Sequence, residues 1–205
     1  MLLSRRALLL SSAPALLAAR RALAADAGAA PAVIQRFYDA LLAVMKAAKH
    51  LSFDQRYQIL ASIIGQTYNL ALMSRLAVGP EWAHMQPPQQ QAVTDAFSRY
   101  TISVYANRFD DYNGERFAVE PTPASNANGV TVQTILTKSD GDKVQLNYLM
   151  RQAPDGAWQV IDVYLSGTIS ELATRRSEFS SVLQQGGGDA LVKLLEQRIA
   201  ALRTG

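Results

Sequence analysis

The apolar residues change their spacing twice along the chain, and this change limits the folds available to it. Up to residue 108 they recur every three or four positions, as on one face of a helix. From residue 117 to 165 they alternate with polar residues, as in half-buried strands, and from residue 169 the helical spacing returns. This order predicts an α+β domain in which N-terminal and C-terminal helices pack on an antiparallel sheet.

Four helices are expected in the first half. Pro31 suits the first turn of the first helix, because its ring presets a helical φ. Ser52 and Gln55 have the spacing of a capping box and should open the second helix. The third and fourth helices are expected over residues 69–78 and 89–108.

The alternating part predicts four strands joined by tight turns. The turns read Ser-Asp-Gly-Asp and Pro-Asp-Gly, in which glycine supplies the positive φ that a hairpin needs. After the sheet, the run Gly186-Gly187-Gly188 should divide two C-terminal helices. The strands are expected around residues 117–119, 130–134, 144–150 and 161–165, and the two helices over 169–183 and 189–202.

Residues 1–24 have the form of a signal peptide, and the remaining residues 25–205 are expected to form the mature domain. Ser4-Arg5-Arg6 precedes an apolar stretch, and Ala22-Leu23-Ala24 is an A-x-A cleavage pattern, so we expect cleavage after Ala24. The arginine pair favours the twin-arginine route, with general secretion as the alternative. An uncleaved anchor is less favoured, because about 13 apolar residues are too few to span a bilayer, which takes about 20.

Charge and composition exclude several functions. Four of the 20 basic residues and none of the 17 acidic ones lie in the leader, so the rest of the chain has a net charge of −1. That balance argues against binding nucleic acid. The chain has no cysteine. His50 and His84 have no metal-ligand spacing around them, and nucleotide-binding motifs are missing, so we expect no metal and no cofactor.

Asp162 is an acidic residue inside an otherwise apolar predicted strand. It could act as a general base in an apolar cavity, or it could form a structural pair with an arginine such as Arg176. We favour the structural pair.

The C-terminal third resembles the MlaC, or toluene-tolerance, family of periplasmic lipid carriers. The resemblance rests on Trp-Gln-Val-Ile-Asp-Val at 158–163, followed by Gly167, Ile169-Ser170 and Arg-Ser-x-Phe at 176–179. The sequence departs from the family pattern at Thr168, an extra residue, and at Arg175, which stands where the family usually has tyrosine. The phrase over 167–179 is similar to the hopanoid-associated branch called HpnM.

The resemblance implies a protein that is not an enzyme and that encloses a phospholipid or hopanoid in an apolar pocket. It implies shuttling in the periplasm between an inner-membrane ABC transporter with its MCE-domain protein and an outer-membrane lipoprotein complex. The residues themselves also allow a second reading, a noncatalytic partner or assembly protein without bound lipid, because an apolar stripe is more often core than ligand wall.

The pocket wall is expected where the inward face of the sheet meets the helices. Alternation places Leu146, Tyr148 and Met150 on one face, while Gln145, Asn147 and Arg151 should face water on the other. The predicted lipid-binding residues are Phe37, Leu41, Phe97, Tyr100, Val104, Val132, Leu146, Tyr148 and Met150.

Overall fold

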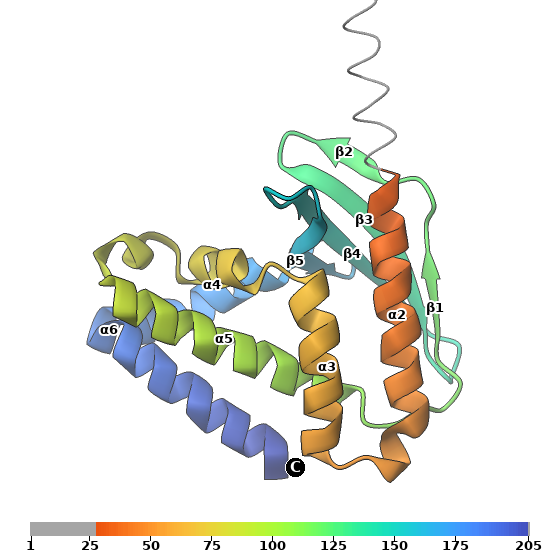
Figure 1. Ribbon diagram of the computed structural model, residues 1–205, viewed down its shortest axis with the longest axis horizontal. Coiled ribbons are helices and arrows are strands. Elements are labelled where there is room, and N and C mark those ends of the chain that lie inside the picture. The colour runs from red at the N-terminus through yellow and green to blue at the C-terminus, as the bar shows by residue number, and fades with distance from the viewer. Residues whose placement is uncertain (1–27, 205) are drawn as a thin grey trace, which may run out of the picture.

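The computed structural model describes residues 28–204, and the predicted signal peptide lies outside them. Within this range the chain is an α+β domain with five α-helices and an antiparallel sheet (Figure 1). The predicted fold class is confirmed. The helices are α2 (Ala29–Ala47), α3 (Phe53–Thr67), α4 (Leu70–Val78), α5 (Pro87–Arg108) and α6 (Glu171–Thr204), with short 3₁₀ turns at Ala48–His50 and Gly79–His84.

Local chemistry sets the helix ends. Ser52 accepts from the backbone N–H of Gln55, whose side chain accepts from the N–H of Ser52, so the predicted capping box opens α3. Helix α4 ends at Gly79, which has a φ of +72°. Gly187, with a φ of +62°, interrupts α6 where the glycine run predicts a break.

The sheet has six strands among the described residues, so the predicted count of four is wrong. The four predicted strands are β1 (Arg116–Val119), β3 (Gly129–Thr137), β4 (Lys143–Gln152) and β5 (Trp158–Leu165). The strand order is β1-β3-β4-β5-β6, and β2 also pairs with β3. The additions, β2 (Ala124–Asn126) and β6 (Ile169–Ser170), are too short for an alternating pattern to reveal. Because β6 occupies Ile169, the last helix begins two residues later than predicted.

A bulge in β5 explains why its burial does not alternate. The register with β4 shifts between Leu149, which pairs with Asp162, and Met150, which pairs with Val160. Residues 160–163 are consecutively buried as a result.

Helix α2 lies across the sheet, where it contacts β1, β3 and β5 (Figure 1). Helix α5 runs beside the C-terminal half of α6, where Arg99 pairs with Glu196. Helix α3 stands between these two groups (Figure 1). Phe37 of α2 is fully buried and makes edge contacts with the rings of Tyr68 and Tyr105, so one aromatic cluster joins α2, α3 and α5.

The outer face of the sheet differs from the prediction at one position. Asn147 is buried rather than exposed, because the turn after β5 folds over it and its side-chain amide donates to the carbonyl of Gly167. Alternation within one strand cannot show that a later turn covers its outer face.

Candidate functional site

An apolar pocket lies between the inward face of the sheet and the helices α4, α5 and α6. Its volume is about 90 Å³. Most of its lining is aromatic or aliphatic. It is lined by Tyr38, Tyr68, Met73, Phe97, Tyr100, Thr101, Val104, Tyr105, Arg108, Phe109, Phe117, Leu146, Tyr148, Val163, Leu165, Glu171, Leu172 and Arg175.

Four tyrosine hydroxyls in the pocket wall are bonded to one another or to the sheet. The Tyr38 hydroxyl lies 2.6 Å from Thr134 Oγ1 and 3.0 Å from the Tyr148 hydroxyl. The Tyr68 and Tyr105 hydroxyls lie 2.6 Å apart. These polar atoms therefore carry their own partners, and an apolar ligand would not leave them unsatisfied.

The same tyrosines are held in the neutral form. Burial raises the pKa of Tyr38 to about 12, although hydrogen bonds with Thr134 and Tyr148 oppose the rise. Burial likewise raises the pKa of Tyr68, Tyr105 and Tyr148 above the ordinary value of 10.0. These four tyrosines therefore carry no charge at physiological pH.

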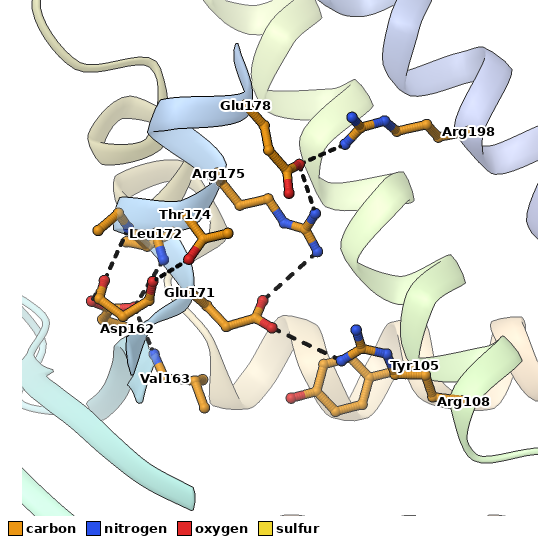
Figure 2. Close-up of polar contacts among 12 residues, drawn as sticks. Tyr105, Arg108, Asp162, Val163, Glu171, Leu172, Thr174, Arg175, Glu178 and Arg198 are labelled. Carbon is orange, nitrogen blue, oxygen red and sulfur yellow. Dashed lines mark hydrogen bonds and ion pairs between the residues drawn. The ribbon is translucent and has the colours of Figure 1, made fainter. Parts of the chain in front are cut away.

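Charge enters the pocket only at its rim, among the lining residues given above. Arg108 comes from the end of α5, and Glu171 and Arg175 come from the first turns of α6. Figure 2 shows the Glu171 carboxylate between the two guanidiniums, at 3.9 Å from Arg108 and 3.8 Å from Arg175. Glu178 and Arg198 continue this row of charges away from the pocket.

Comparisons with known proteins decide the family. The sequence matches the family described as MlaC protein over residues 35–197. This chain belongs to the MlaC family.

Two similar proteins extend the comparison. Toluene tolerance protein ttg2D of Pseudomonas putida is 26% identical to this MlaC protein over 135 residues, which are 65% of the chain and 61% of the relative. The match therefore spans about three fifths of that relative's length. A phospholipid-binding protein from Ralstonia solanacearum, solved in complex with a phospholipid, has a similar fold with a TM-score of 0.74. It is 26% identical, and the match covers 84% of this chain and 98% of that one.

The structure divides the predicted lipid-binding residues into two groups. Phe97, Tyr100, Val104, Leu146 and Tyr148 line the pocket. The other four residues are almost completely buried in the core and do not line the pocket: Phe37, Leu41, Val132 and Met150. Leu146 and Tyr148 of β4 therefore reach the cavity, whereas Met150 on the same face of that strand lies in the packed core.

Several pocket residues were not predicted from the sequence. Tyr105 belongs to the apolar stripe of α5 and could have been included on that ground. Phe117 and Leu165 come from β1 and β5, which β3 and β4 separate in the sheet, so the pattern of a single strand could not show that both line one pocket. The charged rim had one signal in the sequence, the arginine at position 175 in place of the family's usual tyrosine.

The predicted ion pair between Asp162 and Arg176 is wrong. Asp162 is buried and accepts from the backbone N–H groups of Val163 (2.8 Å) and Leu172 (3.2 Å) and from the Ser170 hydroxyl (2.6 Å). Figure 2 shows it below the start of α6, on the side away from Glu171. The carboxylate is thus satisfied by neutral donors at a helix N-terminus, where the helix dipole favours negative charge.

Arg176 has a different partner. Its Nε and Nη2 donate to the carbonyl of Leu76 at 3.0 and 2.5 Å, in the last turn of α4. It therefore ties α6 to α4 through one of the carbonyls that the helix leaves unpaired at its C-terminus.

Residues 28–204 contain neither a membrane-spanning helix nor a cluster of metal-ligand side chains. No helix there is both long and apolar enough to cross a membrane. In the same range, His, Asp and Glu side chains form no cluster of three or more that could hold a metal ion.

Proposed function

We propose that this MlaC protein is a periplasmic carrier that holds the apolar part of a lipid in the pocket and moves it between the inner and outer membranes. One observation carries the proposal: most of the pocket wall is aromatic or aliphatic, and four of its tyrosine hydroxyls are already paired. Family membership and the similar fold of a phospholipid-binding protein support it.

Binding without catalysis fits the chemistry of the wall. The pocket groups with shifted pKa values are tyrosines, and burial moves their pKa away from neutral pH. General acid–base catalysis calls for a pKa near the working pH. Asp162, the other candidate base, is occupied by three hydrogen bonds outside the pocket. We therefore propose a carrier that is not an enzyme and uses no metal, nucleotide or redox cofactor.

The pocket volume sets a condition on binding. About 90 Å³ is well below the roughly 300–1,000 Å³ that ligand sites usually enclose. Lipid binding therefore requires the helices and the sheet to move apart. Each buried CH₂ would contribute about 0.8 kcal/mol, so about ten carbons could offset a substantial opening cost.

The small volume also favours one alternative, a noncatalytic partner or assembly protein without bound lipid. The two functions differ in what the purified protein contains.

The lipid class and the partners extend the proposal. The phrase over residues 167–179 supports membership of the hopanoid-associated HpnM branch, so we propose either a glycerophospholipid or a hopanoid as ligand. We further propose export with cleavage after Ala24, and exchange of the lipid with an inner-membrane ABC transporter and its MCE-domain protein and with an outer-membrane lipoprotein complex. These partners follow from the family, and no nucleic acid is among them.

The test is to express the chain with its leader, purify it from the periplasm without lipid-like detergent, and analyse it by native mass spectrometry. A carrier should show a species heavier by one lipid, and extraction should identify that lipid as a phospholipid or a hopanoid. N-terminal sequencing of the same sample checks the cleavage site. Protein that is empty, and stays empty after incubation with vesicles of membrane lipid, would support the partner role.

A further inference from the structure

The charged rim of the pocket has more positive than negative residues. Three of the described lining residues carry a formal charge: two arginines, Arg108 and Arg175, and one carboxylate, Glu171. The rim therefore has a net charge of +1 in a domain whose overall charge is close to zero. These three residues line the same pocket as the apolar side chains, so one lipid can contact both groups.

The contacts of Glu171 leave both arginines capable of binding something else. Its carboxylate oxygens lie 3.9 Å from Arg108 and 3.8 Å from Arg175, which is beyond hydrogen-bond distance. One carboxylate is thus shared between two guanidiniums through charge alone. Arg108, with 57% of its side chain exposed, has the freedom to reorient toward a ligand.

Arg175, in contrast, is held in place. Only 15% of its side chain is exposed, its Nη1 lies 3.1 Å from Glu178, and its guanidinium stacks 5.1 Å from the centre of the Tyr100 ring. Burial would raise the pKa of Glu178, but hydrogen bonds and charge from Arg198 and Arg175 outweigh it and keep the pKa below the ordinary value. Glu178 therefore stays anionic and anchors Arg175, and Tyr100 connects this anchor to the pocket wall.

We propose that Arg108 and Arg175 form a subsite for the phosphate of a phospholipid headgroup, with Glu171 as the internal counter-ion that the phosphate displaces. A guanidinium presents two parallel N–H groups that match the oxygens of a phosphate, and a preordered arginine loses little entropy on binding. The subsite rests on the proposed carrier function and adds selectivity to it: tails are held by the apolar wall, and the headgroup phosphate is held by the two arginines.

The test uses three lipids with the same lauroyl chain: lauroyl-lysophosphatidylglycerol, lauroyl-lysophosphatidylcholine and monolauroylglycerol. The first two contain a phosphate and the third does not. Binding is measured by calorimetry below the critical micelle concentrations. We expect the wild-type protein to bind both phosphate lipids about ten-fold more tightly than monolauroylglycerol, with the difference shrinking at high salt because part of it is electrostatic.

Variants locate the effect. Arg108→Gln and Arg175→Gln should each reduce the affinity for both phosphate lipids several-fold and leave monolauroylglycerol unchanged. Glu171→Gln should increase the affinity for the phosphate lipids. Arg116→Gln, on β1 with its exposed side chain, removes the same charge outside the pocket and should change none of the three affinities. Arg108 is exposed, so its variant should fold even if the Arg175 variant does not.

The outcomes separate the two proposals. If no lipid binds, monolauroylglycerol included, the carrier function fails and the subsite fails with it. If all three lipids bind equally and the arginine variants change nothing, the carrier function stands and the phosphate subsite is overturned. An equal loss in the Arg116 variant would assign the effect to net charge and would also overturn the subsite.

Discussion

Replacing Asp162 by alanine tests how α6 is attached to the sheet. The carboxylate accepts from the Leu172 N–H and the Ser170 hydroxyl at the start of α6 and from Val163 within β5, and only 8% of the residue is exposed. Alanine would leave two donors of the α6 start without this acceptor, at about 1–3 kcal/mol for each buried donor that stays unsatisfied. It would also remove a favourable charge at the helix N-terminus, about 0.3–1 kcal/mol.

We therefore expect Asp162→Ala to lower the free energy of unfolding by about 3 kcal/mol. For a domain of this size that corresponds to a fall in Tm of roughly 6–12 °C. Circular dichroism at 222 nm or calorimetry would measure it. Asp162→Asn, which keeps one acceptor oxygen, should lose less, and Asp95→Ala, at an exposed position of α5, should change the stability by no more than about 0.5 kcal/mol.

A double-mutant cycle with Arg176→Ala makes the test sharper. Asp162 and Arg176 have no shared partner, so their effects should add within about 0.5 kcal/mol. A coupling energy clearly above that value would mean that the two residues do form a pair in solution. An unchanged Tm in Asp162→Ala would refute the role of the carboxylate at the helix start.

Two further predictions concern the stability of the helices that surround the pocket. Gly79→Ala should lower the free energy of unfolding in urea by about 1–2 kcal/mol, because Gly79 has a φ of +72° and an added Cβ would lie 3.1 Å from Arg176 Nε. A neutral result would show that the turn relaxes freely. The control is Gly65→Ala, where an added Cβ would have nothing within 4 Å. Because the folded-state pKa of Glu178 is depressed, its contribution to stability is present above the unfolded value near 4.5 and is lost as the pH falls through the folded value. Glu178→Gln should therefore lose more stability at pH 7 than at pH 3, and an equal loss at both pH values would contradict the assigned charge interactions.

Local signals in the sequence predicted the helices and most of the sheet. The capping box at Ser52 and the glycine break in α6 were found because each depends on a few neighbouring residues. The short strands β2 and β6 were missed because two or three residues carry no periodicity, and the bulge in β5 breaks the alternation that the prediction uses.

The pocket was predictable only in part, for a physical reason. Alternation shows which side of β4 faces inward, and Leu146 and Tyr148 on that side line the pocket. It cannot show where the helices leave a gap, and Val132 and Met150 on the same face meet tightly packed core instead. The partners of Asp162 were missed because two of them are backbone N–H groups, which every residue except proline carries, and the third, the Ser170 hydroxyl, approaches only through the turn after β5.

The most direct test of the central claim is to fill the pocket with a tryptophan side chain and to measure bound lipid by native mass spectrometry. Val104→Trp and Leu146→Trp add bulk to the lining, and Ala92→Trp adds the same side chain to the exposed face of α5 as a control. After folding is checked by circular dichroism, native mass spectrometry measures the fraction of each variant that carries lipid. We expect the two pocket variants to lose most of their lipid while the control keeps the wild-type fraction. If folded pocket variants carry as much lipid as the control, this pocket is not where the protein holds it.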